Sequence, residues 1–196
     1  MGSMSVPLVV FLHGLGRTPQ FWQDQVSALP PGTRAVAPWL DGLRPGGSDG
    51  FELTRAADAV LGQLNRFGVD QVALVGSGLG ASVAVAAAGR SPAAVSHLVL
   101  TDLLPRTAKL AGGLQRLAVR AMPTAQLAEA GLDRGKMLAM MKASASVDLR
   151  ALLPQVTAQT LLLGGSGNPA GVSAARELAA GIAGARVEVI GRAGGS

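Results

Sequence analysis

The sequence predicts an α/β domain in which a parallel sheet is covered by helices on both faces. Short apolar runs that suit buried strands alternate along the chain with longer segments of helical period. Such alternation is typical of βαβ units, whose strands are parallel. At 196 residues, with 48% hydrophobic and 15% charged residues, the chain can bury one core and is too apolar to be disordered. We expect a single domain over residues 1–196 with about six strands.

The first three elements occupy the N-terminal fifth of the chain. Residues 6–14, "VPLVVFLHG", form a near-continuous apolar run that ends in glycine, as in strands buried on both faces. A helix should follow over 18–30, with Thr18 as its N-cap. Residues 33–40 then predict a short strand, and the Gly-rich stretch 41–50 predicts a loop.

The middle of the chain continues the alternation. Residues 51–68 carry apolar residues at helical spacing and end at Gly68, which suits a helix C-terminus. The run 71–76, "QVALVG", predicts a buried strand, and 79–90, "LGASVAVAAAGR", predicts the helix after it. The next strand is expected over 96–102.

The C-terminal half begins with a change of pattern. Residues from about 105 to 154 predict a helical insert with no strand. A strand is then expected over 159–165, a helix over 170–184 and a last strand over 185–191.

Composition excludes several kinds of site. The chain has no cysteine and two histidines, so thiolate chemistry is impossible and a metal centre is not expected. No cofactor is expected either. No apolar run is long enough for a membrane span, and the N-terminal "MGSMSV" does not resemble a signal peptide, so we expect a cytoplasmic protein. Few aromatic residues and no binding motif argue against nucleic acid as a partner.

The helical insert is the basic part of the chain. Residues 106–150 contain eight basic and three acidic residues, which account for the whole net charge of +5. These charges suit a solvated helix face, or alternatively an anionic substrate or partner. Five apolar side chains of the insert are candidates to line a substrate pocket, as an alternative to ordinary packing: Leu114, Leu117, Met137, Met140 and Met141. These side chains would suit a small hydrophobic substrate, which could also carry a carboxylate. Whether the protein forms a homo-oligomer is left open.

The glycine turn "ALVGSGLGAS" between the third strand and its helix has two interpretations. Gly76, Gly78 and Ala81 satisfy the G-x-G-x-x-A pattern that cradles a dinucleotide pyrophosphate such as that of NAD. Asp102 follows the next strand, where an acid that binds ribose would lie. Against this, the pattern usually opens the first βαβ unit, and here two strands precede it.

The other interpretation uses more of the chain. "VVFLHGLGRTPQFW", "LVGSGLGA" and "TLLLGGSGNPAG…RAGGS" resemble, in this order, the first core segment, the nucleophile elbow and the closing segment of the α/β-hydrolase superfamily. The resemblance spans nearly the whole chain, with a helical cap inserted at about 105–154. It implies the α/β-hydrolase fold and ester, lactone or related C–C bond hydrolysis.

The same resemblance implies that the catalytic triad is absent. Because Gly76 and Gly80 must be the small residues flanking the elbow, Gly78 stands where the family has its serine. Asn168 falls at the acid position and Gly195 at the histidine position, with Asp102 as an alternative acid. Without a serine, its base and its orienting acid, serine-type hydrolysis is not expected.

Other parts of such a site are retained. The backbone N–H groups of Leu15 and Leu79 match the oxyanion-hole positions of the family, and Trp22 is expected to line the pocket. Support is expected from Gly14, Ser77 and His13, with His13 holding the backbone rather than titrating. The hypotheses left open are a disabled hydrolase, a pocket retasked for chemistry such as cyclisation, and a binding module that includes the dinucleotide variant. The other histidine, His97, is expected to be a structural or surface residue.

Overall fold

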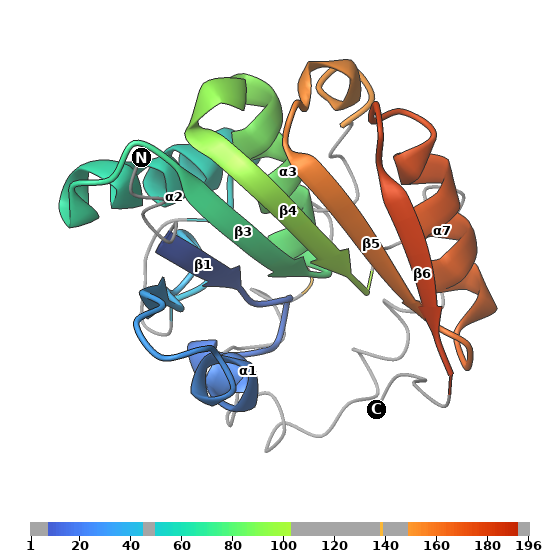
Figure 1. The fold of residues 1–196 in the computed structure, drawn as a ribbon, viewed down its shortest axis with the longest axis horizontal. Helices are drawn as coiled ribbons and strands as arrows, with labels where there is room; N and C mark the ends of the chain where they lie inside the picture. The colour runs from blue at the N-terminus through green and yellow to red at the C-terminus, as the bar shows by residue number, and fades with distance from the viewer. Residues whose placement is uncertain (1–7, 45–49, 103–137, 139–148, 192–196) are drawn as a thin grey trace.

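A computed structural model of the chain describes residues 8–44, 50–102, 138 and 149–191. These residues form a six-stranded sheet in the order β2-β1-β3-β4-β5-β6, and every neighbouring pair is parallel (Figure 1). The predicted α/β class and parallel sheet are therefore confirmed. The strands are β1 Leu8–Leu12, β2 Ala35–Val36, β3 Val72–Ser77, β4 Val95–Thr101, β5 Gln159–Gly165 and β6 Arg186–Ile190.

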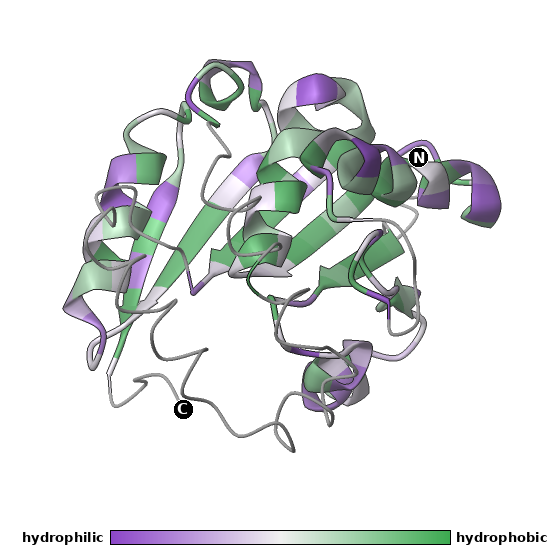
Figure 2. Cartoon of the chain, turned by 180° about the vertical axis from the view of Figure 1, so that it is seen from behind, coloured by the Kyte–Doolittle hydropathy of each residue, from purple (hydrophilic) through white to green (hydrophobic). Residues whose placement is uncertain are grey.

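Helices lie on both faces of this sheet. Figures 1 and 2 show α2 (Leu53–Phe67), α3 (Leu79–Arg90) and α7 (Pro169–Ala179) over one face. The connection from β1 to β2 contains the 3-10 helix η1 (Pro19–Trp22) and α1 (Gln23–Ser27). Because β2 and β3 flank β1 on opposite sides, right-handed crossovers place this connection on the other face.

Local sequence explains both ends of α2. The Glu52 carboxylate caps its first turn by accepting hydrogen bonds from the backbone N–H groups of Thr54 (2.8 Å) and Arg55 (2.7 Å). These two bonds hold the pKa of Glu52 below its usual value. The helix ends at Gly68, which adopts the left-handed conformation (φ 60°) that the sequence predicts for it.

Helix α3 is the central helix of the domain. Ten of its twelve residues are buried, because it packs on β3 and β4 with one side and on α2 with another. Alanine and glycine dominate its sequence and let the helix lie close to the sheet. The tight packing fixes the start of α3 directly at the end of β3.

Three expected elements are shorter than predicted. The helix expected over 18–30 is split into η1 and α1, and Thr18 makes no side-chain cap hydrogen bond. The strand expected over 33–40 is limited to β2, because Pro38 has no N–H to continue the ladder. Helix α7 ends five residues before the predicted residue 184. The turn that follows α7 includes Gly184 at φ 72°.

Most of the expected helical insert, residues 103–137 and 139–148, lies outside the described residues. The pocket candidates Leu114, Leu117, Met137, Met140 and Met141 are among them, as is Gly195 near the C-terminus. In the part of the chain that is described, no helix combines the length and apolarity that a membrane span requires.

Candidate functional site

Three chain segments meet where β1, β3 and β4 end. The connection after β1 leads to one side of the sheet and the connection after β3 to the other, and ligands of open α/β sheets bind at the carboxyl ends of two such strands. Gly14 follows β1, Gly78 follows β3 and Asp102 follows β4. An ideal Cβ at Gly78 would lie 3.8 Å from both the Gly14 Cα and the Asp102 carbonyl oxygen. The turn at Gly78 is thus the centre of the site.

Gly78 has the backbone conformation of a sharp strand-to-helix turn. Its φ of 55° and ψ of −115° lie in a region that side-chain-bearing residues adopt only with strain. The turn is held by its backbone: the Gly78 N–H donates to the Thr101 carbonyl (3.0 Å), and the Gly78 carbonyl accepts from Ala81 N–H (3.1 Å). The residue at position 78 is therefore lifted out of the strand and faces Gly14 and Asp102.

The two flanking glycines are required by packing. A Cβ at Gly76 would lie 2.6 Å from the Gly80 carbonyl oxygen, and one at Gly80 would lie 2.1 Å from the Leu12 carbonyl oxygen. Both contacts are with backbone that has no room to move. By contrast, the described residues leave ordinary contact distances around Gly78. Close packing thus accounts for Gly76, the first glycine of the G-x-G-x-x-A pattern, without a bound pyrophosphate.

Ser77 and Asp102 form a hydrogen-bonded pair beside this turn. The Ser77 hydroxyl donates to the Asp102 Oδ2 atom at 2.7 Å. Ser77 is only 3% exposed, whereas Asp102 is exposed. Sequence reasoning named both residues but missed their contact. The signal for it is that each polar residue stands at the carboxyl end of one of two neighbouring strands, and such ends meet at one sheet edge.

The expected oxyanion donors lie on the segments that contact Gly78. Leu79 is the first residue of α3, and the first N–H groups of a helix have no partner within it. The positive end of the helix dipole adds a preference for negative charge at this point. Leu15 follows Gly14, whose Cα lies 3.8 Å from the Cβ position of Gly78. These positions suit donors to a carbonyl oxygen that develops negative charge.

His13 is a structural side chain in this fold. It is fully buried; its Nδ1 lies 3.0 Å from the Gly14 carbonyl oxygen, and its Nε2 accepts from the Leu40 N–H at 3.2 Å. The acceptor role of Nε2 places the proton on Nδ1, which donates to Gly14. Burial lowers the pKa of His13, so the ring is neutral. Both nitrogens are engaged, and neither is available as a base.

The side chain of Asn168 is engaged in capping a helix, and His97 lies away from Gly78. Asn168 caps α7, with its Oδ1 accepting from the Gly171 N–H at 3.0 Å. His97 is exposed near the amino end of β4, with its Nδ1 3.1 Å from the Ser96 Oγ. It thus lies at the opposite end of that strand from Asp102.

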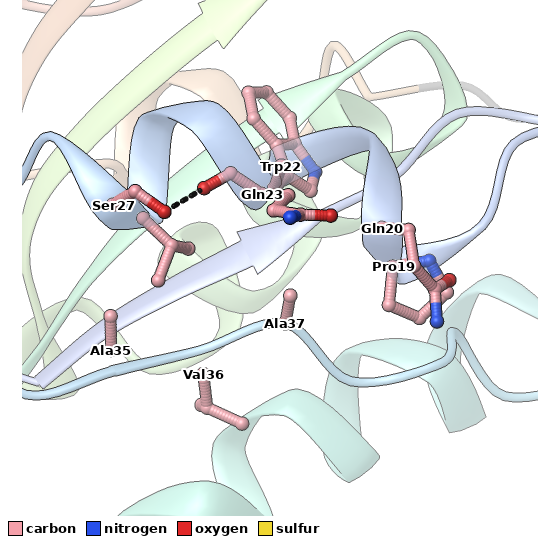
Figure 3. Close-up of a pocket in the computed structure, with 9 residues that line it drawn as sticks. Pro19, Gln20, Trp22, Gln23, Ser27, Ala35, Val36 and Ala37 are labelled. Atoms are coloured by element: carbon pink, nitrogen blue, oxygen red, sulfur yellow. Dashed lines mark hydrogen bonds between the residues drawn. The ribbon is translucent and has the colours of Figure 1, made fainter.

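Trp22 lines a hollow at the β2 edge of the sheet. This hollow of about 300 Å³ is formed by residues of η1, α1 and β2 and by Ala37, and none of its lining residues belongs to the Gly78 turn (Figure 3). Trp22 is 5% exposed and packs against Phe11 and Phe21, at centroid distances of 5.2 and 4.9 Å. Over the described ranges, no group of three or more potential ligands is gathered for a metal ion.

Comparisons with known proteins agree with this architecture. A family model described as "Alpha/beta hydrolase family" matches residues 9–195. A pimeloyl-[acyl-carrier protein] methyl ester esterase of Aromatoleum aromaticum is 36% identical over 102 residues, which are 52% of this chain and 39% of that protein. The match therefore spans well under half the length of this curated relative.

Solved structures resemble the whole chain at low sequence identity. The enol-lactonase of Burkholderia xenovorans LB400 has a TM-score of 0.76 at 20% identity, with 94% of this chain and 83% of that chain covered. A structure from a study of carboxylesterases of Nitrososphaera gargenis has a TM-score of 0.80 at 13% identity, with 98% and 84% covered. MenH from S. aureus has a TM-score of 0.76 at 16% identity, with 98% and 87% covered. These likenesses show the fold.

Proposed function

The chain belongs to the alpha/beta hydrolase family, and from this premise we propose that it binds small ester or lactone compounds without forming an acyl-enzyme. The observation that carries the proposal is the elbow conformation of Gly78, with φ 55° and ψ −115°. Position 78 is where an elbow presents its nucleophile. A glycine at that position has no oxygen to attack a carbonyl.

Among the residues that the structure describes, no side chain near Gly78 replaces the missing serine. Ser77 is 3% exposed and its hydroxyl is engaged with Asp102. Serine also needs a base, and both nitrogens of His13 are already hydrogen-bonded. Asn168 is an amide that caps a helix, and Gly195 has no side chain to act as the base.

The ester or lactone class is supported by what remains of the site. The N–H groups of Leu15 and Leu79 suit a carbonyl oxygen, and an esterase and an enol-lactonase are among the proteins that this chain resembles. We assign the hydrophobic part of the ligand to the apolar residues of the insert, and a carboxylate, where present, to its arginines. In serine hydrolases, the oxyanion hole and binding alone leave roughly 10³–10⁴-fold catalysis over water. Slow turnover without a covalent intermediate is therefore compatible with the proposal.

The test compares this chain with a variant that carries a restored triad. The triple variant Gly78→Ser, Asn168→Asp, Gly195→His is assayed with p-nitrophenyl acetate beside the unaltered chain, with intact-mass analysis for an acetyl adduct. A matched control replaces Gly78→Ser by Gly78→Ala in the same background, because it carries the backbone strain without the hydroxyl. We expect a burst and a turnover-linked adduct from the serine variant alone.

Two results would overturn parts of this proposal. A turnover-linked adduct on the unaltered chain would show that it has a nucleophile of its own. If the folded serine variant also lacks a burst, position 78 is not a nucleophile position. The pocket would then serve another reaction, such as cyclisation.

A further inference from the structure

Asp102 is held in an unusual backbone conformation beside the Gly78 turn. With φ 52°, it is the only non-glycine residue of positive φ among the described residues. Aspartate tolerates this region better than most residues, but the conformation still costs conformational energy. Strain of this kind is found most often at functional sites. The strained residue here is an exposed carboxylate at the end of β4.

The Asp102 carboxylate is oriented by a buried partner. The Ser77 hydroxyl, on a residue that is 3% exposed, donates to Oδ2 at 2.7 Å. Ser77 is the last residue of β3 and is paired in register with Thr101, so the sheet itself sets the distance between the two side chains. This bond occupies one carboxylate oxygen and fixes the direction of the other, Oδ1.

The main chain of Asp102 lies beside the position where a family nucleophile would act, and the hydrogen bond from Ser77, the residue before Gly78, holds its carboxylate next to the same turn. The Asp102 carbonyl oxygen lies 3.8 Å from the Cβ position of Gly78, and the Gly14 Cα lies at the same distance on the other side. A water molecule bound to Asp102 above Gly78 would face a carbonyl whose oxygen lies at the Leu79 N–H. We propose that Asp102 is a catalytic base that activates such a water molecule for direct hydrolysis of a small ester or lactone. The inference rests on the proposed function.

The reaction needs no covalent intermediate. The Asp102 carboxylate takes a proton from water while the water oxygen forms a bond to the carbonyl carbon. The carbonyl electron pair moves onto the oxygen, where the N–H groups of Leu79 and Leu15 stabilise the negative charge. When the carbonyl re-forms, the C–O bond to the leaving alkoxide breaks and the alkoxide takes the proton from Asp102. The products are a carboxylic acid and an alcohol, and the acid then ionises in solution.

The other polar side chains that the structure describes beside the Gly78 turn cannot take this role. His13 is fully buried, with both nitrogens hydrogen-bonded to backbone, and Ser77 has no base other than Asp102 itself. Ser77 is a positioning residue in this scheme, because it acts through Asp102 and is not exposed to a substrate.

The experiment compares Asp102→Asn with the unaltered chain in hydrolysis of p-nitrophenyl acetate and of δ-valerolactone. Asparagine keeps the size of the side chain but cannot accept a proton. Asp70→Asn is the matched control, because Asp70 is exposed and precedes β3, at the opposite edge of the sheet. The lactone excludes a contribution from reaction of the exposed His97 with the activated ester. Binding of δ-valerolactone is measured separately by ligand-observed NMR.

We expect Asp102→Asn to lose about a hundredfold or more of kcat for both substrates, as for loss of a general base. KM and lactone binding should be retained, and Asp70→Asn should match the unaltered chain. The unaltered chain should show a solvent deuterium isotope effect that Asp102→Asn loses. Ser77→Ala should lower kcat less than Asp102→Asn does, with KM unchanged, because the carboxylate remains but is no longer oriented.

Each contrary outcome has a separate meaning. Turnover that Asp102→Asn leaves unchanged overturns the role of Asp102, and so does lactone binding without any turnover; neither contradicts the proposed function. A turnover-linked acyl adduct on the unaltered chain overturns the proposed function. Absence of both binding and turnover overturns both.

Discussion

Replacing Gly78 by serine tests the conformation on which the site depends. The substitution places a hydroxyl at the position that we propose for the family's nucleophile and adds a Cβ at φ 55° and ψ −115°. Among the described residues, that Cβ meets only the Gly14 Cα and the Asp102 carbonyl oxygen, each at 3.8 Å. These are ordinary contacts. The cost of the substitution therefore comes from backbone strain and not from collision.

The expected loss of stability follows from two opposing terms. A non-glycine residue in a sparsely populated region costs about 1–3 kcal/mol. Replacing glycine also restricts the unfolded chain, which returns about 0.4–1 kcal/mol. The free energy of unfolding should fall by about 1–2 kcal/mol for Gly78→Ser. For a chain of this length, that corresponds to a fall in Tm of roughly 2–8 °C.

The assay is thermal unfolding of three matched glycine-to-serine variants. Gly62→Ser, in an exposed part of α2 with nothing within 4 Å of its Cβ, should not lower Tm, because serine is a better helix former than glycine. Gly80→Ser should lower Tm far more than Gly78→Ser, because its Cβ would lie 2.1 Å from the Leu12 carbonyl oxygen. A Gly78→Ser protein as stable as the unaltered chain would refute the elbow conformation, and equal losses at 78 and 80 would refute the packing argument.

Two further predictions concern His13, which precedes Gly14, and Asn168, the N-cap of α7. His13→Leu should destabilise the fold by about 2–4 kcal/mol, because it leaves the Gly14 carbonyl and the Leu40 N–H buried without partners. Burial lowers the pKa of His13 below its ordinary 6.5, so below that pH the unfolded chain binds a proton that the folded chain does not. The free energy of unfolding should therefore fall as pH drops below about 6.5. In melts between pH 5 and 7.5, His13→Leu should lose this part of the pH dependence. Asn168→Asp should keep or slightly raise Tm, because aspartate caps a helix as well as asparagine does, whereas Asn168→Ala should cost about 0.5–2 kcal/mol in denaturant unfolding. An Asn168→Ala protein as stable as the unaltered chain would contradict the capping role.

Sequence patterns predicted most of the fold because the signals for it are local. The run around Val75 is apolar and ends at a glycine, which is enough to predict a buried strand and a tight turn. The start and end of α3 were predicted correctly, at Leu79 and Arg90. The helix expected after Thr18 was less regular than predicted, because its cap hydrogen bond is absent and Trp22 is its only buried residue in η1 and α1.

Part of the site was also readable from the chain. The alignment of Gly76, Gly78 and Gly80 with an elbow predicted small residues at positions 76 and 80, and the structure leaves no room for a side chain at either position. That position 78 is the nucleophile position stays a prediction. The sequence alone shows that residue 78 is a glycine, with no side chain to act as a nucleophile. From it follows the expectation that serine-type hydrolysis is lost.

The tertiary structure decided which polar groups meet. Ser77 and Asp102 are 25 residues apart, and their hydrogen bond exists because the parallel register of β3 and β4 brings the two strand ends together. In the same way, His13 is neutral and structural because Leu40, 27 residues later, donates to its Nε2 inside the core. Periodicity and glycine content determine the backbone conformation over a few neighbouring residues. The two contacts depend instead on how segments far apart in the sequence pack together, and a local pattern does not specify that packing.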